Sequence, residues 1–177
     1  MTAKLKRGIT KVKDPGSALT HFIAMILAII AAIPLLSKAG HDSGHMRISA
    51  LAIFILSMIG LYAASTIYHT LDISPKINKL LRKIDHMMIF ILIAGTYTPV
   101  CMIVLGDKTG WTMLTLVWGI AIVGILINAL WITCPKWFSS LIYIAMGWVC
   151  ILAITKILSS MPRAGFMWLL AGGIIYT

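Results

Sequence analysis

Long apolar runs occupy most of this sequence, and five of them approach or exceed the roughly 20 residues that a helix needs to cross a bilayer. Only 11% of the residues are charged and 60% are hydrophobic, whereas a soluble domain carries about 25% charged residues. This pattern predicts an all-α membrane protein, a bundle of transmembrane helices. The predicted spans are residues 19–36, 48–69, 84–105, 111–132 and 138–155.

A sixth apolar run begins near Ala164, and the sequence reaches Thr177 while it is still apolar. This run is too short to cross a bilayer, so the pattern predicts a chain that is truncated within helix six. The expected organisation is a basic N-terminal tail over residues 1–18, followed by one transmembrane helical domain over residues 19–177. The basic flank of the first span also suits a signal peptide, but that span is long for one and four more follow.

The distribution of Lys and Arg predicts the orientation. The N-terminal tail and the segments 70–83 and 133–137 hold ten basic residues, whereas the connections on the other side hold five. Because Lys and Arg accumulate on the cytoplasmic side of membrane proteins, we expect a cytoplasmic N-terminus. No basic face with interleaved aromatic residues lies outside the apolar runs, so the net charge of +10 does not indicate nucleic-acid binding.

The connection before the third span carries a helix start signal. Ser74 followed by Pro75 suits an N-cap with proline at the first helical position. The next residues alternate between apolar and basic at helical spacing, which predicts a short interfacial helix on the cytoplasmic leaflet. Within the later spans, we expect Asn128 to form an interhelical hydrogen bond and Lys156 to extend toward water.

Polar residues of three spans are predicted to meet at the cytoplasmic side. His69 ends the second span, Asp85 begins the third, and His21 lies near the start of the first. Ser65 precedes His69 by one helical turn and shares its face. Ionisable residues in spans usually face the bundle interior and mark functional sites. The alternative is that each imidazole at a helix end simply extends to water.

This set of residue types suits a metal centre. Neutral imidazole is a common zinc ligand, and a catalytic zinc takes three protein ligands and a water. We predict His69 as a metal ligand, Asp85 as the catalytic group that handles a proton of the water, and Ser65 as its catalytic hydrogen-bonding partner. His21 and His86 are the only other imidazoles on this side and are less favoured as ligands; His45 is predicted on the opposite side.

Four motifs resemble the bacterial hemolysin III family, which is related to the progestin and adipoQ receptors and to the alkaline ceramidases. They are "SALTHFIA", "STIYH", "RKIDHMMIFILIAGTYTPV" and "YIAMGW", and the likeness extends from about Asp14 to the end of the sequence. It implies a seven-helix bundle with a cytoplasmic N-terminus in the bacterial plasma (inner) membrane, of which five full spans and part of a sixth are present here.

The resemblance also implies a zinc site. The family's SxxxH motif on helix two is matched by Ser65 and His69, and its aspartate on helix three by Asp85. Its HxxxH pair on helix seven has no counterpart, so the remaining ligands are expected beyond Thr177. Before helix one the family often shows E-x-x-N-x-x-T-H, and the matching positions here are Asp14, Ser17, Thr20 and His21. The resemblance favours packing or a hydrogen bond, rather than metal binding, for His21.

Three functions remain open at this point. The first is a zinc-dependent hydrolase that acts on lipid amide bonds, by analogy with the ceramidases. The second is a non-enzymatic regulator or sensor of membrane lipid state with a structural zinc. The third is a channel-forming cytolysin, as the family name implies, although long uninterrupted spans are typical of a resident membrane protein. Membrane lipids are the expected partners in each case, and the sequence does not specify an oligomeric state.

Overall fold

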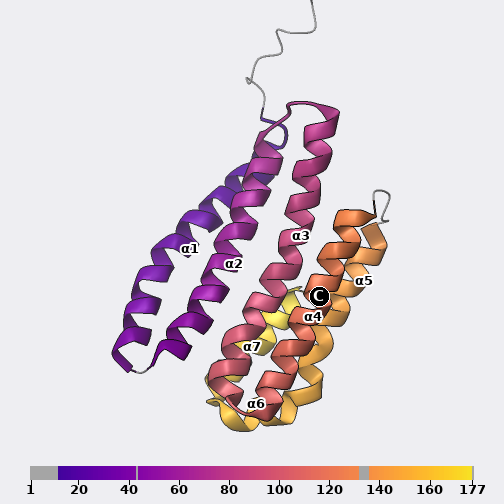
Figure 1. Cartoon of the computed structure of the whole chain (residues 1–177). Coiled ribbons are helices and arrows are strands. Elements are labelled where there is room, and N and C mark those ends of the chain that lie inside the picture. Colours follow the sequence, from indigo (N-terminus) through magenta and orange to yellow (C-terminus); the bar gives the residue numbers. More distant parts are fainter. Residues whose placement is uncertain (1–11, 43, 132–135, 177) are drawn as a thin grey trace, which may run out of the picture.

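The structure is a computed structural model that describes residues 12–42, 44–131 and 136–176, and these ranges contain helices and no strand (Figure 1). Two short segments, η1 and η2, depart from α-helical geometry: η1 is a π-helix and η2 a 3₁₀-helix. The elements are α1 (Pro15–Asp42), α2 (His45–Thr70), α3 (Pro75–Pro99), η1 (Val100–Leu105), α4 (Lys108–Leu130), α5 (Lys136–Trp148), η2 (Val149–Ala153), α6 (Ile154–Ser160) and α7 (Arg163–Tyr176).

Five segments are long and apolar enough to cross a membrane, which confirms the predicted all-helical class with five long spans. The observed helices exceed the apolar runs at most ends, because polar residues that flank an apolar run can still continue a helix. The sixth run forms α7, a shorter apolar helix. The spans are Pro15–Gly40, His45–Thr70, Pro75–Leu105, Lys108–Leu130 and Trp137–Ser160.

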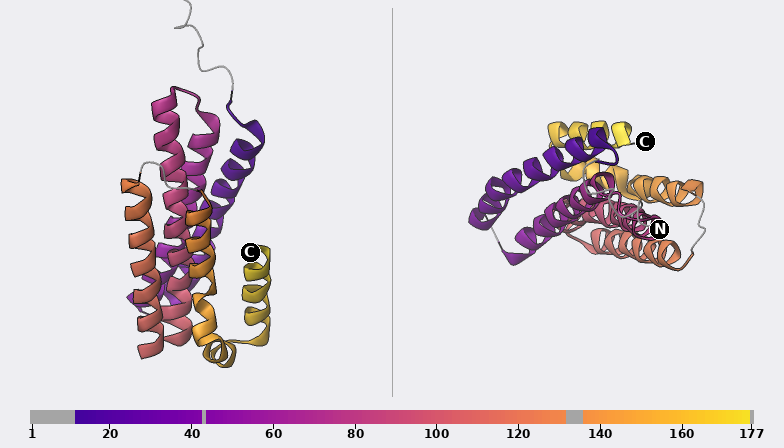
Figure 2. Two further views of the ribbon diagram at one scale, coloured as in Figure 1. Left: turned by 90° about the vertical axis from the view of Figure 1, so that its right-hand side faces the viewer. Right: turned by 90° about the horizontal axis from the view of Figure 1, so that it is seen from above.

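Successive spans run antiparallel, and α1, α2, α3 and α4 each pack against the next (Figures 1 and 2). We call the end where α1 begins and α2 ends the proximal end, and the opposite end, where α1 ends and α4 begins, the distal end. From the distal end α7 folds back beside α6 (Figure 2). Side chains of α3, α4 and α5 without exposed surface include Phe90, Ala94, Val117, Ala121 and Met146, and Ala50 of α2 is equally buried.

The start of α3 confirms the predicted cap but not the predicted interfacial helix. The hydroxyl of Ser74 accepts a hydrogen bond from the Ile77 amide at 3.3 Å, and Pro75 is the first helical residue. The segment after it is not a separate helix, because no Gly or Pro interrupts it before the apolar part of α3. Its first turns therefore project beyond the end of α4 (Figure 1), and Lys83 Nζ donates to the Ala129 carbonyl at 2.5 Å.

The two polar residues that the sequence placed in later spans both have partners. Asn128 Oδ1 accepts from the Ser139 hydroxyl at 3.0 Å, which confirms an interhelical hydrogen bond between α4 and α5. Lys156 reaches the distal end, where it forms an ion pair with Asp107 and donates to the Thr109 hydroxyl at 3.1 Å. The hydrogen bond from the Lys156 ammonium holds the pKa of Asp107 below its ordinary value. The sequence did not indicate this carboxylate partner.

The hydroxyl of Tyr97 on α3 interrupts the backbone hydrogen bonds of the fifth span. In a regular helix the Cys150 amide would donate to the Met146 carbonyl four residues earlier. Here the amide donates to the Tyr97 hydroxyl at 2.9 Å, and that hydroxyl lies 2.9 Å from the Met146 carbonyl and 2.8 Å from that of Gly147. The α-helix ends at Trp148 and a 3₁₀ segment follows. A polar side chain thus satisfies backbone groups that a lipid environment would leave unpaired.

Removal of this hydroxyl is expected to destabilise the bundle. In Tyr97→Phe, the Cys150 amide loses its acceptor and the two carbonyls lose a donor, inside a well-packed region. A buried polar group left without a partner costs about 1–3 kcal/mol. We expect a lower free energy of unfolding by about that amount in detergent titrations. Tyr68→Phe on α2 is the matched control and should change the stability less. Equal stability of the two variants would show that the Tyr97 hydroxyl does not stabilise the backbone of the fifth span.

Candidate functional site

Polar side chains of α1, α2 and α3 meet at the proximal end of the bundle. The Ser65 hydroxyl lies 2.6 Å from His21 Nδ1, and the ring centroids of His21 and His69 are 5.7 Å apart. The carboxyl group of Asp85 lies near the Ser65 hydroxyl and within electrostatic range of the His69 imidazole. We call His21, Ser65, His69 and Asp85 the polar cluster. The structure thereby brings together the three residues that the sequence predicted at one depth, His21, His69 and Asp85, and Ser65, one turn from His69.

Helical periodicity explains the contribution of α2 to this cluster. Ser65 and His69 are four residues apart and therefore lie on the same face, one turn from each other. That face points toward α1, because Tyr62, one turn earlier, has its ring centroid 6.0 Å from that of His21. Ser65 is only 4% exposed, so its hydroxyl needs an internal partner, which His21 provides.

Asp85 is a buried carboxylate, with an exposed fraction of 8%. Burial of a charge is costly unless other groups pair with it, and the neighbouring His86 has its Nδ1 atom 3.3 Å from Asp85 Oδ2. Among the described side chains, this Nδ1 atom is a buried nitrogen that forms no hydrogen bond of good geometry. His86 is held through its carbonyl, which accepts from the Tyr143 hydroxyl at 2.8 Å. It thus lies against Asp85 rather than within the polar cluster.

Asp14, which the sequence did not single out as a site residue, also contacts the cluster. Its Oδ2 atom lies 3.2 Å from His69 Nδ1 and accepts from the Ser17 hydroxyl at 2.8 Å. The hydrogen bond from Ser17 is the main reason why the pKa of Asp14 is below its ordinary value. A signal did exist, because Asp14, Ser17 and His21 follow the i, i+3, i+7 spacing of one helical face.

The donor set of the cluster is partly suited to zinc. Imidazole nitrogen and carboxylate oxygen are ordinary zinc ligands, and His69 is the imidazole with a carboxylate behind it. However, the part of the chain that the structure describes contains no group of three or more His, Cys, Asp or Glu side chains arranged to hold a metal ion. His21 Nδ1 is engaged by Ser65. These residues therefore supply one favourable ligand and its hydrogen-bonding surroundings, not a complete coordination sphere.

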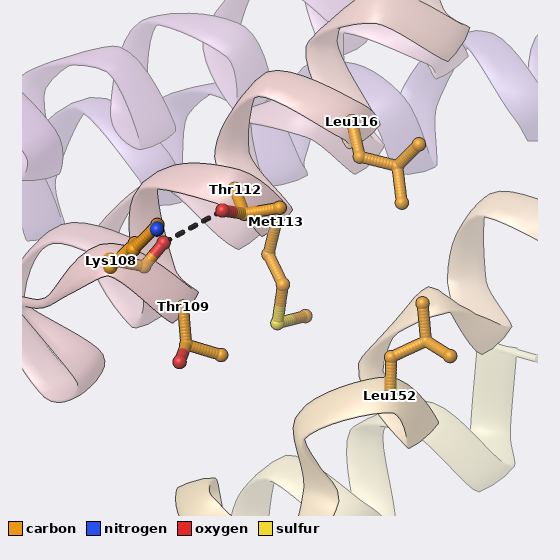
Figure 3. A pocket seen from close by; sticks show the side chains of 6 residues that line it. All are labelled: Lys108, Thr109, Thr112, Met113, Leu116 and Leu152. Atoms are coloured by element: carbon orange, nitrogen blue, oxygen red, sulfur yellow. Dashed lines mark hydrogen bonds between the residues drawn. The ribbon is translucent and has the colours of Figure 1, made fainter.

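A hollow lies at the distal end, between the start of α4 and η2 (Figure 3). Its polar groups are engaged locally: the Thr112 hydroxyl donates to the Lys108 carbonyl at 2.8 Å, and Thr109 accepts from Lys156. No His, Cys or acidic residue lines it, so it offers none of the usual metal ligands, and Lys108 is the one ionisable residue among those that line it. The lining residues are Lys108, Thr109, Thr112, Met113, Leu116 and Leu152. His45 also lies toward this end, as expected, in the first turn of α2.

Comparisons with known proteins agree with the motifs. The family model described as Haemolysin-III related matches residues 9–177. A Bacillus cereus protein named Hemolysin-3 is 39% identical over 178 aligned residues, which cover 100% of this chain and 81% of that relative. A Hemolysin-3 homolog of Bacillus subtilis (strain 168) is 36% identical over 165 residues, 93% of this chain and 77% of the relative. No solved structure matches the chain significantly. With its five apolar spans, the chain belongs to the haemolysin III-related family of membrane proteins.

Proposed function

We propose that this protein is a membrane hydrolase of lipid amide bonds and that the polar cluster is its catalytic site. The observation that carries the proposal is the buried carboxylate of Asp85 on α3, at the end of the bundle where a serine and two histidines of α1 and α2 meet. Ionisable groups inside membrane bundles are costly and mark functional sites by default. A carboxylate beside a hydroxyl and imidazoles is the set of groups that proton transfer to and from a water requires.

Each residue of the polar cluster has a separate proposed role in the hydrolysis, which follows from its chemistry. The Asp85 carboxylate accepts a proton from the attacking water and returns it to the leaving amine. With the Nδ1 proton on His21, the Ser65 oxygen accepts that hydrogen bond. Its own proton would be donated to the Asp85 carboxylate at rest, and to the oxyanion of the substrate once Asp85 has accepted the proton of the water. The apolar outer surfaces of the surrounding helices would keep the acyl chain of the substrate in the membrane.

The proposal includes zinc, with His69 as a ligand. Such a site would need two further protein ligands beside His69, and the described residues do not supply them together with it. When bound, zinc would supply a Lewis acid that polarises the substrate carbonyl and lowers the pKa of water to about 7. The proposed location is the plasma membrane of a bacterium, with the proximal end on the cytoplasmic side. The excess of basic residues on that side supports this orientation.

Substitution of the buried carboxylate tests the proposed function. Asp85→Asn keeps the shape of the side chain but removes the proton acceptor, so we expect the turnover of a fluorescent N-acyl sphingoid lipid to fall roughly 100-fold or more. The assay uses the purified protein in phospholipid vesicles supplemented with zinc. Asp107→Asn at the distal end is the matched control and should retain turnover. A turnover of the Asp85→Asn variant equal to that of the wild type would exclude Asp85 as the proton acceptor.

A second candidate function is favoured by the name of the relatives, Hemolysin-3. A channel-forming cytolysin would release a trapped dye from vesicles in proportion to the protein added. Purified protein reconstituted into dye-loaded vesicles measures this directly. Vesicles that stay tight at several chains each would exclude lysis as the function of this chain, whereas release without turnover would favour it over hydrolysis.

A further inference from the structure

The region before and at the start of α1 makes several contacts with the last turn of α2. The Asp14 amide donates to the His69 carbonyl at 2.9 Å, and the Lys13 amide donates to the Thr70 carbonyl at 3.4 Å. The Asp14 carboxylate also lies 3.2 Å from the His69 ring nitrogen Nδ1. Asp14 therefore meets both the main chain and the side chain of one residue, His69.

We propose that Asp14 is a positioning residue for His69, whose carboxylate holds the imidazole ring in place with its proton on Nδ1. This inference rests on the proposed function, in which His69 binds zinc through its other nitrogen. A carboxylate is only an acceptor of hydrogen bonds, and a neutral imidazole carries one proton. The contact therefore places that proton on Nδ1 and leaves the lone pair on Nε2. A histidine that ligates a metal through Nε2 needs this tautomer.

The position of the Asp14 carboxylate is itself determined by neighbouring groups. The Ser17 hydroxyl donates to the same Oδ2 atom at 2.8 Å, so the carboxylate is held from the side of α1 as well. On the His69 side, the Tyr68 ring centroid lies 4.8 Å from that of His69, and Lys13 Nζ lies 3.6 Å from the Tyr68 centroid. These contacts restrict the rotation of the imidazole that Asp14 holds.

Asp14 and Asp85 have different environments, which suit different roles. The Asp14 side chain is 48% exposed, so water surrounds part of it, and it meets the cluster only through His69 in the structure described. Asp85 is buried, contacts His86 and lies near Ser65. The exposed carboxylate suits the orientation of a histidine, whereas the buried one suits a direct role in proton transfer.

The tautomer of His69 can be measured without zinc or substrate. Nitrogen chemical shifts of ¹⁵N-histidine-labelled protein in detergent micelles, recorded at a pH where the ring is neutral, distinguish Nδ1–H from Nε2–H. We expect His69, assigned with His69→Gln, to be Nδ1-protonated in the wild type. In Asp14→Ala the Nδ1–H tautomer of His69 should no longer be the predominant one. Asp72→Ala is the control. The Asp72 carboxylate accepts a hydrogen bond from Asn78, so its removal should leave the His69 signals unchanged.

An unchanged His69 tautomer in Asp14→Ala would overturn the proposal. If that variant does not fold, Asp14→Lys gives a test of opposite sign, because an ammonium group only donates hydrogen bonds and favours a lone pair on Nδ1. A His69 that stays Nδ1-protonated in Asp14→Lys would then overturn the proposal.

The turnover assay separates this inference from the proposed function. If the protein is a hydrolase, Asp14→Ala should lower its turnover by roughly 10- to 100-fold. A tautomer change in Asp14→Ala, in a protein that shows no hydrolysis at all, would support the positioning role and exclude the hydrolase.

Discussion

Replacement of His69 by alanine is expected to abolish both zinc retention and lipid amide turnover, with a loss of turnover of roughly 100-fold or more. His69 contacts Asp14 and lies beside His21 in the polar cluster. It is also the residue that we propose to bind the metal. Alanine removes the nitrogen that we propose as a ligand and leaves the Asp14 carboxylate without its ring partner. Elemental analysis of purified protein gives the zinc content per chain, and the fluorescent N-acyl lipid assay gives turnover.

The control for this variant is His45→Ala. His45 is in the same helix as His69 but is exposed at the opposite end of it, so the same chemical change should leave zinc content and turnover intact. Zinc retained equally by both variants would exclude His69 as a ligand. Turnover retained in His69→Ala would in addition exclude the polar cluster as the catalytic site.

Substitution of Gly95 by alanine is expected to destabilise the contact between α2 and α3. A Cβ atom at this position of α3 would lie 2.2 Å from Ser57 Oγ and 2.8 Å from Ser57 Cβ on α2. Rotation of the serine would move only its hydroxyl, so the two helices would have to separate. Overpacking of this kind costs about 1–3 kcal/mol. We expect Gly95→Ala to lower the free energy of unfolding by that amount, as measured by denaturation in mixed micelles.

Two comparisons isolate the cause of this loss. Gly119→Ala on α4 adds a Cβ atom where no other atom lies within 4 Å, so it should be neutral or stabilise by up to about 1 kcal/mol through helix propensity. Ser57→Gly removes the atoms that the new Cβ would meet, and the double variant should regain part of the lost stability. Equal stability of Gly95→Ala and Gly119→Ala would show that α2 and α3 are not in close contact here.

The spans could be predicted from the sequence because the length of an apolar run is almost sufficient to define a membrane helix. The register of α2 was equally accessible, since Ser65 and His69 are separated by one turn of any α-helix. The local breaks at η1 and η2 were not predicted. The 3₁₀ segment depends on the Tyr97 hydroxyl, which comes from a helix about fifty residues earlier in the chain, and no local pattern specifies which span a tyrosine will enter.

The candidate site was predictable to the same extent. His21, His69 and Asp85 were placed at one depth because the spans that carry them alternate in direction, and Ser65 was placed one turn from His69 on the same face. Asp14 was missed as a partner of His69, because its spacing to Ser17 and His21 places it on one face of α1 but does not indicate which residue of α2 lies opposite that face. The roles of these residues and the presence of zinc remain predictions, since they depend on ligand chemistry that residue spacing does not determine.

The hydrogen bonds from the amides of Lys13 and Asp14 to the carbonyls of Thr70 and His69 have a consequence for biosynthesis. The chain is made from the N-terminus, so these amides emerge long before the carbonyls that they bond. Until α2 has been translated and inserted, the region where α1 begins cannot acquire these partners. The α1–α2 hairpin is thus the smallest translation product in which the Asp14–His69 contact can form. A ribosome-bound chain arrested before α2 is complete should lack it.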